Sequence, residues 1–363
     1  MENSNCNITQ KIKIPSNIVF KNRKLNKKVD INKYITYLIH IKIDEKDIIL
    51  IFADISIIIY ELPSLDKVFY KNSYYSFSFP NRIQKLNNNV LIILSEETTI
   101  TLLIKKDKNL NKYNIYKGKI FDYSFQSINL IQLPNSNLVL LSNKIIYLFQ
   151  LKEEKEIEFE DCINNTNIIK QKLPFYKNYY QIKLDSSYRY LDIISMNNEI
   201  IVYHNTKYIY IYSLKNKQNI FYIEVLIDSS TDDVIKKISD EIFCFCGRNI
   251  IYFISIKLGM IIKQITLSNN SHIVASQCLN NNYIVFAYSQ KFYQGEYISI
   301  IFEQYNYKIF KYKNEEMIKI DLVLKEVLQK KNGSGNIFIY ELEDGKIVTC
   351  VNTNIYVYNA LTE

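Results

Sequence analysis

Short apolar runs alternate with short polar turns, and this pattern recurs along most of the chain. One unit contains an apolar run, a tight turn rich in Asn, Asp and Glu, a second apolar run, a polar break, and a third run rich in Ile and Tyr. The clearest copies extend from Ile193 to Leu214 and from Phe338 to Asn359. Apolar runs bounded by such turns predict short antiparallel strands.

The unit occurs seven times at a nearly regular spacing. The first residues of the second strands are Ile48, Val90, Leu138, Ile200, Ile242, Tyr283 and Ile347. Successive positions in this series are 42, 48, 62, 42, 41 and 64 residues apart. Four of these spacings are close to the roughly 40 to 50 residues that four short strands and their turns occupy, whereas two are longer.

The turns before these positions have the chemistry that hairpins require. Examples are Asn87–Asn89, Asn197–Glu199 and Asn280–Asn282. Asn and Asp tolerate a left-handed backbone and hydrogen-bond to nearby amides, so they suit tight turns. The β-branched strands between the turns are continuously apolar, which predicts burial on both faces. Because helical periodicity is almost absent, we expect an all-β fold.

The series resembles a known architecture. Aromatic residues end the third strand of several copies, in the pairs Tyr60-Glu61, Phe149-Gln150, Tyr212-Ser213 and Tyr358-Asn359. From about Tyr34 to Asn359 the chain resembles a seven-bladed β-propeller and is most similar to a divergent WD-repeat protein, although the Trp-Asp and Gly-His signatures of that family are absent. The resemblance implies a single β-propeller of about seven four-stranded antiparallel blades. It also implies a non-enzymatic scaffold that binds other proteins within a multiprotein complex.

The pattern divides the chain into two parts, which are a basic N-terminal segment at 1–33 and the propeller at 34–363. The last copy ends after its third strand, so its blade lacks an outer strand. The segment from Ile8 to Ile14 alternates apolar and polar residues in its second half, and we expect it to supply that strand. The alternative is that residues 1–33 are a disordered basic tail.

The first long interval contains an insertion at Cys162 to Arg189. Insertions in repeat folds usually lie on surface loops, often on a binding face. Basic and aromatic side chains are interleaved here, and the candidate binding residues are Lys170, Lys172, Tyr176, Lys177, Tyr179, Tyr180 and Arg189. They suggest a protein-binding surface or, alternatively, a site for RNA or an anionic membrane. A purely structural interpretation makes Tyr180 to Leu184 another strand.

The second long interval contains an insertion at Lys313 to Asn336. Asn314 can cap an amphipathic helix whose apolar face includes Met317, Ile320 and Leu324. The alternation of apolar residues from Ile318 to Leu324 fits a strand equally well. The sequence therefore predicts either one short helix or a further strand at this position.

Charge and composition add little to this picture. Of 363 residues, 45 are Lys or Arg and 37 are Asp or Glu, so the net charge is +8. Lys is spread along the chain, so this excess favours anionic partners only mildly. Residues 1–10 contain no apolar run behind basic residues, and no apolar run reaches the roughly 20 residues of a transmembrane helix. We expect a cytoplasmic or nuclear protein.

The motifs of common enzymes are missing. The three histidines, His40, His204 and His272, are far apart, and no glycine-rich phosphate loop or Gly-x-Ser-x-Gly sequence occurs. Cys244 and Cys246 share one face of a strand, and we expect them to be packed thiols rather than zinc ligands. The sequence thus indicates no catalytic residues, no metal and no cofactor.

Overall fold

The computed structural model describes residues 25–358 with several gaps. The segments outside the description within this range are 32–34, 54–55, 63, 73–81, 87–88, 95–98, 108–111, 121–127, 143, 163–167, 186–189, 226–234, 248, 268–270, 280–282, 293–296, 307–318, 330–336, 343 and 352–353.

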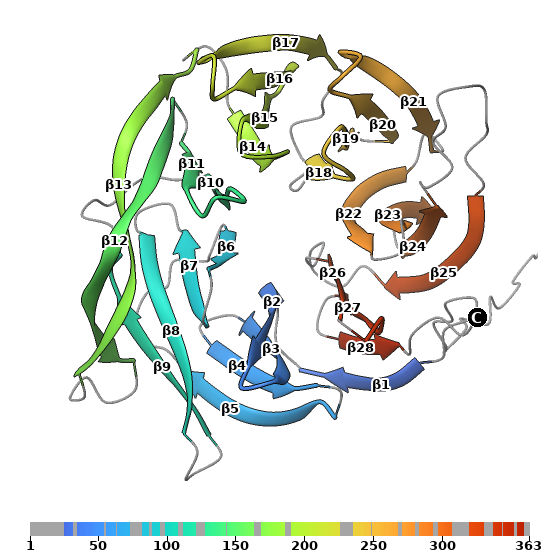
Figure 1. Ribbon diagram of the computed structural model, residues 1–363. Coiled ribbons are helices and arrows are strands. Elements are labelled where there is room, and N and C mark those ends of the chain that lie inside the picture. Colours follow the sequence, from blue (N-terminus) through green and yellow to red (C-terminus); the bar gives the residue numbers. More distant parts are fainter. Residues whose placement is uncertain are drawn as a thin grey trace, which may run out of the picture.

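The described residues form antiparallel sheets that stand side by side around a central axis (Figure 1). Blade 1 contains β2 (Ile35–Ile43), β3 (Lys46–Ala53), β4 (Ser56–Glu61) and β5 (Asp66–Asn72). Blade 2 contains β6 (Arg82–Lys85), β7 (Val90–Leu94), β8 (Thr99–Asp107) and β9 (Lys112–Gly118). Blade 3 contains β10 (Asn129–Gln132), β11 (Leu138–Leu141), β12 (Ile145–Asp161) and β13 (Ile168–Lys183).

The remaining blades repeat the arrangement. Blade 4 contains β14 (Tyr190–Ser195), β15 (Ile200–Asn205), β16 (Tyr208–Ser213) and β17 (Gln218–Glu224). Blade 5 contains β18 (Ile235–Lys237), β19 (Ile242–Cys246), β20 (Ile250–Ser255) and β21 (Met260–Thr266). Blade 6 contains β22 (Ser271–Leu279), β23 (Tyr283–Phe292), β24 (Tyr297–Asn306) and β25 (Lys319–Gln329). Blade 7 contains β26 (Ile337–Glu341), β27 (Ile347–Val351) and β28 (Asn354–Tyr358), together with β1 (Leu25–Asp30).

This architecture is a seven-bladed β-propeller, as the sequence predicted. The second strands are the most deeply buried, and every residue of β7 and β11 is inaccessible to solvent or nearly so. Their side chains fill the spaces between successive blades, because each sheet packs on both of its faces. Continuous runs of Val, Leu and Ile satisfy this requirement, since neither face of these strands meets water.

The turns between first and second strands have the predicted chemistry. Asp44 and Asn89 have positive φ angles of 46° and 65°. In blade 4 the Asn197 side chain accepts hydrogen bonds from the amides of Glu199 (2.8 Å) and Ile200 (2.9 Å). These side-chain caps allow the chain to reverse within a few residues.

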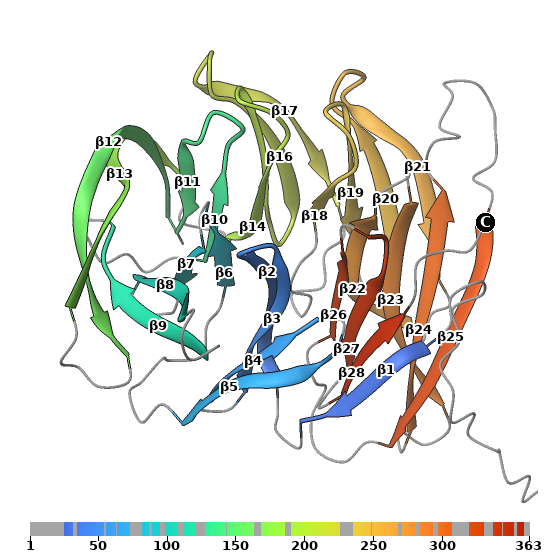
Figure 2. The same cartoon turned by 60° about the horizontal axis from the view of Figure 1, so that its bottom comes forward.

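The ring closes through residues from both ends of the sequence. The strand β1 pairs antiparallel with β28, from Leu25 opposite Tyr358 to Asp30 opposite Asn354 (Figures 1 and 2). Leu25–Asp30 therefore occupies the outer position of blade 7. The segment Ile8 to Ile14, which we expected there, lies outside the described residues.

The prediction of a helix within Lys313 to Asn336 is wrong, because Lys319–Gln329 forms β25. This strand pairs with β24 from Tyr297 opposite Gln329 to Tyr305 opposite Lys319. The two-residue alternation of apolar side chains therefore indicates the structure better than the helical spacing. Every regular element among the described residues is a strand, so none of them is a helix that could cross a bilayer.

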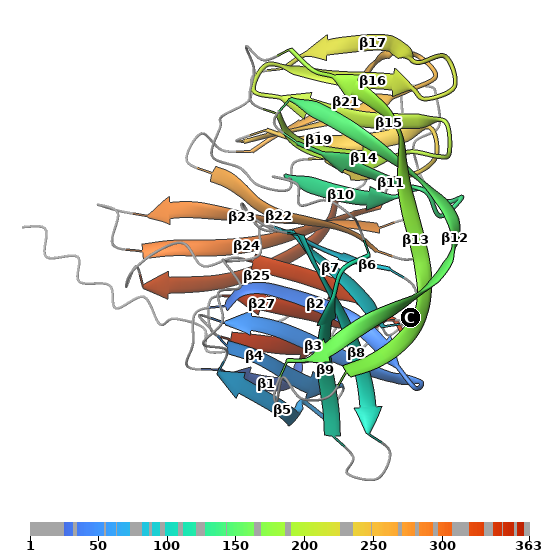
Figure 3. The same ribbon diagram turned by 90° about the vertical axis from the view of Figure 1, so that its left-hand side faces the viewer.

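Blades 2 and 3 are joined into one eight-stranded sheet. The strands β12 and β13 contain 17 and 16 residues, about twice the length of most of the other strands. One end of β12 pairs with β11 in blade 3, and its far end, Glu160 and Asp161, pairs with Lys117 and Tyr116 of β9 in blade 2. The β12–β13 hairpin thus crosses the outside of the ring from one blade to the next (Figure 3).

Candidate interaction surface

Six of the seven predicted binding residues lie on the β12–β13 hairpin. Residues 168–183 form the outer strand of blade 3 rather than the surface loop that we expected. Of the seven candidates, Lys170, Lys172, Lys177 and Tyr179 are exposed, and Tyr180 is half-buried. Arg189 lies outside the described residues. The structure therefore places most of the candidates on one strand, of which four are accessible.

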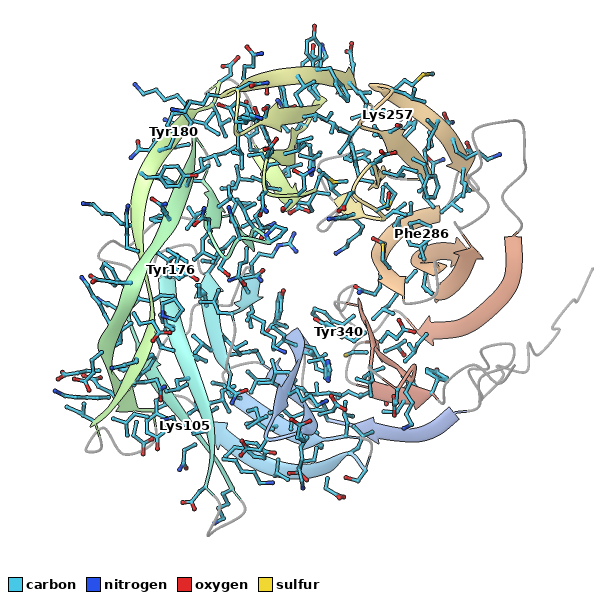
Figure 4. The ribbon with its side chains drawn as sticks, in the orientation of Figure 1. Lys105, Tyr176, Tyr180, Lys257, Phe286 and Tyr340 are labelled. Carbon is cyan, nitrogen blue, oxygen red and sulfur yellow. The ribbon has the colours of Figure 1, made fainter. Side chains whose placement is uncertain are left out.

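Tyr176 is a core residue rather than a surface residue. Its side chain packs with Ile157, Phe159 and Leu173 against the apolar layer between blades 2 and 3. Burial raises the pKa of its hydroxyl to about 12. Figure 4 shows it where the hairpin passes over blade 2. Tyr176 therefore anchors the hairpin on the apolar core, and its ring is not accessible to a partner.

Two of the exposed lysines, Lys170 and Lys172, face acidic side chains on the neighbouring strand. Lys170 lies opposite Glu158, and its Nζ is 3.5 Å from Glu158 Oε1 and 3.9 Å from Glu156 Oε2. Lys172 lies opposite Glu156. Across the whole hairpin six acidic side chains are matched by six lysines, so its net charge is zero. This surface is a charge ladder, in which acidic side chains of β12 lie beside lysines of β13, rather than a basic patch.

Sequence reasoning missed the length of this hairpin, although a signal was present. From Glu156 to Glu160 the residues alternate strictly between Glu and the apolar side chains Ile157 and Phe159. Ile157 and Phe159 are buried, whereas the glutamates between them are exposed. Such a period of two is typical of a strand with one face on a core. It predicts that β12 continues well beyond the usual end of a third strand.

A second polar cluster, also missed from the sequence, connects three blades near the central axis. Asp192 of β14 lies 3.4 Å from the guanidinium of Arg82 in blade 2 and accepts a hydrogen bond from the Asn129 side chain in blade 3. Its Oδ1 also accepts a hydrogen bond from the amide of Ile193 (2.8 Å). Asp192 is the only acidic residue of the largely apolar strand Tyr190–Ser195. Such an isolated acid is the sequence feature that could have indicated this cluster. Because its charge is paired and hydrogen-bonded, the cluster is a connection between blades.

His204 lies beside this cluster and is fully buried. Its Nδ1 is 3.1 Å from the carbonyl oxygen of Asn205, so Nδ1 carries the proton, and its ring packs edge-on against Phe245 of blade 5 at 5.3 Å. Its Nε2 has no hydrogen-bond partner among the described residues. Burial lowers the pKa of His204, while the Asp192 charge opposes this effect. The imidazole is therefore neutral at pH 7.

A third polar cluster joins blades 1 and 2. Glu61 accepts hydrogen bonds from Lys46 (3.0 Å), Lys106 (3.2 Å) and the hydroxyl of Tyr113 (2.9 Å). Burial alone would raise the pKa of Glu61, but the hydrogen bonds from these three side chains outweigh it and lower the pKa. Glu61 thus accepts a hydrogen bond from each of the other three side chains, and the cluster connects blade 1 with blade 2.

A polar cavity of about 470 Å³ lies where the innermost strands of blades 2 to 5 end. Gln84, Gln132, Ser195 and Lys237 contribute to its wall. Lys237 is its single cationic lining residue, and its Nζ lies 2.6 Å from a carboxylate oxygen of Asp240 and also donates to the carbonyl oxygen of Met196. The charge of this lysine is therefore already compensated within the protein.

Among the described thiols, none belongs to a cluster of potential metal ligands. Cys244 and Cys246 are buried in the core of blade 5, and burial raises the pKa of Cys244 well above the usual value of a thiol. Cys278 lies 3.0 Å from the carbonyl oxygen of Lys237. Within the described part of the chain, no three His, Cys, Asp or Glu side chains approach one another closely enough to hold a metal ion.

Comparisons with known proteins support the fold. No family model and no curated protein matches the sequence. Among solved structures, the chain is similar to BBS1N, crystallised in complex with ARL6DN, with a TM-score of 0.56 and 12% identity over 95% of this chain and 98% of that one. It is also similar to the β-propeller domain of Cps50 (Swd1) from Myceliophteria thermophila, with a TM-score of 0.53 and 9% identity over 93% of this chain and 99% of that one.

Proposed function

We propose that this propeller is a non-enzymatic scaffold that binds other proteins within a multiprotein complex in the cytoplasm or nucleus. Two findings support the proposal. One structurally similar propeller, BBS1N, was crystallised in complex with another protein. In addition, the charges of Asp192 and Glu61 are compensated by neighbouring side chains, whereas the β12–β13 hairpin presents an exposed surface that the packing of the blades does not require.

The observation that carries the proposal is the charge ladder of the β12–β13 hairpin. One face of the hairpin is fixed by Ile157, Phe159 and Leu173, which pack on the core. The other face holds Glu156 and Glu158 of β12 opposite Lys172 and Lys170 of β13, together with exposed Tyr179. A rigid surface of mixed charge suits a protein partner with the complementary pattern, because opposite charges fix the register of an interface.

RNA or an anionic membrane is a weaker candidate for the same surface. Binding to a polyanion requires an excess of basic side chains that neutralise phosphates. The hairpin carries as many acidic as basic side chains, and Lys170 is paired with two glutamates. The lysines that sequence analysis selected therefore fit a mixed-charge protein interface better.

The test exchanges the charges of one pair without removing the pair. In the variant Glu158→Lys/Lys170→Glu, the two exchanged side chains still attract each other, while the new carboxylate at position 170 also lies near Glu156. Because interactions between exposed charges are weak, we expect a free energy of unfolding within about 1 kcal/mol of the wild type. The charge pattern of the surface is nevertheless reversed at this point. Tagged wild-type and variant chains are purified from the native cell, and we expect partners held by the hairpin to be lost from the variant.

The matched control is an exchange of another pair, Lys42→Glu/Glu45→Lys, whose charges lie 3.6 Å apart on blade 1. This control should retain the partners. Retention of every partner by both variants would contradict a role for the hairpin. Binding of RNA or anionic vesicles that decreases steeply between low and physiological salt would instead favour the polyanion.

A further inference from the structure

The outer strand of blade 4 differs from the other six outer strands. The sequences of β1, β5, β9, β13, β21 and β25 each contain at least one lysine, whereas β17, Gln218–Glu224, contains none. A lysine on an outer strand discourages other chains from pairing with its free backbone groups. The edge of β17 therefore lacks a protection that every other blade has.

The surface of β17 is also unusually apolar. Ile220 is 48% exposed and Tyr222 is 65% exposed. On the neighbouring blade 5, Leu258 in the β20–β21 turn is 48% exposed and Met260 at the start of β21 is 54% exposed. These four residues include most of the large apolar side chains that are strongly exposed in the described part of the chain. Contiguous exposed apolar side chains indicate a surface for interaction with another molecule.

One face of β17 packs against blade 5. A side chain added at Gly259, in the β20–β21 turn, would meet the ring of Phe221 in β17 at 3.6 Å. Figure 4 shows Lys257 beside the junction of β17 and β21. Phe221 therefore faces blade 5, whereas Ile220 and Tyr222, which alternate with it, lie on the opposite face of β17 and form the β17 patch.

The edge of β17 is already in the conformation that strand addition requires. Its inner side pairs with β16 from Tyr208 opposite Glu224 to Ser213 opposite Gln218. The Tyr222 ring packs edge-on against Tyr208 at 5.5 Å. No described strand pairs with the other side of β17, whose outward amides and carbonyls are thus available. An extended segment is the structure that satisfies such a row of backbone groups.

We propose that the free edge of β17 binds an extended segment of a partner protein as a fifth strand of blade 4. Alternate side chains of this segment are apolar, because they lie over Ile220 and Tyr222. The site is distinct from the β12–β13 hairpin, so the two proposals stand or fall separately.

Two lysines near the patch indicate the chemistry of one end of the bound segment. Lys215 and Lys257 lie on the β16–β17 and β20–β21 turns, are exposed, and have no ion-pair partner among the described residues. The Glu199 and Glu241 carbonyl oxygens accept hydrogen bonds from the amides of Leu214 and Ile256, so these glutamates lie near the same turns. The two lysines remain unpaired despite these neighbours, and an acidic residue at that end of the segment complements them.

The experiment uses a display library of random twelve-residue peptides, selected on the purified full chain. We expect the selected peptides to alternate apolar and polar residues and to carry Asp or Glu near one end. A labelled peptide from this set is then titrated by fluorescence anisotropy. The variant Tyr222→Lys adds the missing protective charge at an exposed position and should weaken binding by about tenfold or more.

Two further variants test whether this effect is specific to β17. Gln264→Lys adds the same charge to β21 and should bind the peptide like the wild type. Ile220→Lys places a lysine at the second exposed apolar position of β17 and should also weaken binding. The melting temperatures of Tyr222→Lys and Ile220→Lys are first compared with that of the wild type, to show that both variants are folded. Hydrogen exchange should slow at amides of β17 when the peptide binds to the wild-type chain.

The proposal is overturned if no peptide is enriched, if the selected peptides space their apolar residues as a helix does, or if Tyr222→Lys and Ile220→Lys both bind as the wild type does. A concentration-dependent dimer that Tyr222→Lys abolishes would assign the edge to a second copy of this chain. Binding of anionic vesicles that the same variant strengthens would assign the patch to a membrane.

Discussion

Single buried polar side chains connect blades that are distant in the sequence. Asp192 joins Arg82 of blade 2 and Asn129 of blade 3 to blade 4, and His204 lies next to this group with its Nε2 unpartnered. Asp192 also lies directly opposite His204 in the β14–β15 pair. The sequence could not reveal this cluster, because Arg82 and Asp192 meet only once the ring has formed.

The burial of His204 predicts a dependence of stability on pH. Its folded pKa lies below 6.5, so the unfolded chain binds a proton at acidic pH that the folded chain does not. Stability due to the neutral imidazole is therefore complete above pH 6.5 and is lost as the pH falls below it. Relative to His204→Phe, the free energy of unfolding of the wild type should decrease by up to about 1.4 kcal/mol per pH unit below 6.5.

This comparison is made by urea unfolding at several pH values between 5 and 8. The phenylalanine variant retains a ring against Phe245 and serves as the reference without a titrating group. Parallel pH profiles for the two chains would show that His204 does not titrate differently in the folded and unfolded states.

At the scale of elements, the contact between Gly118 and Phe159 fixes the β12–β13 hairpin on blade 2. A Cβ at Gly118 would lie 2.8 Å from the Phe159 ring and 3.0 Å from the carbonyl oxygen of Glu158. Phe159 is fully buried, so its ring has little space to move away. The absence of a side chain at residue 118 is therefore what allows β12 to approach β9.

The variant Gly118→Ala should consequently destabilise the protein, by about 1–3 kcal/mol, because it overpacks this contact. Denaturant unfolding measures the effect. Combining it with Phe159→Leu makes room for the new methyl group, so the double variant should lose less stability than the sum of the two single variants. Additive losses would mean that the two residues do not compete for the same space.

At the scale of the whole molecule, the pairing of β1 with β28 closes the ring. Deleting residues 1–30 removes β1 and exposes the backbone groups of β28, which should lower the melting temperature by several degrees and promote aggregation. Differential scanning fluorimetry and size-exclusion chromatography measure both effects. Deleting only residues 1–16 leaves β1 in place and serves as the control, for which we expect a nearly unchanged melting curve. Equal curves for both deletions would show that β1 contributes little.

Local sequence signals predicted those features of the fold that depend on neighbours in the chain. Turn residues such as Asn89 and Asn197 and apolar strands such as Val90–Leu94 established the repeat. The candidate site was less predictable, because its exposed residues depend on strands that run past one another. Lys170 looked like part of a basic loop, and only the register of β12 against β13 shows that Glu156 and Glu158 lie beside it.

The hairpin that joins blades 2 and 3 also limits how this array of repeats can change in length. Most neighbouring blades meet through side chains, so one unit can be replaced by another that presents a similar surface. Blades 2 and 3 share backbone hydrogen bonds through β9 and β12. Loss or duplication of either unit would leave one of these strands without its counterpart. We therefore expect the two repeats to be gained or lost only together, and the ring to change its number of units elsewhere along its circumference.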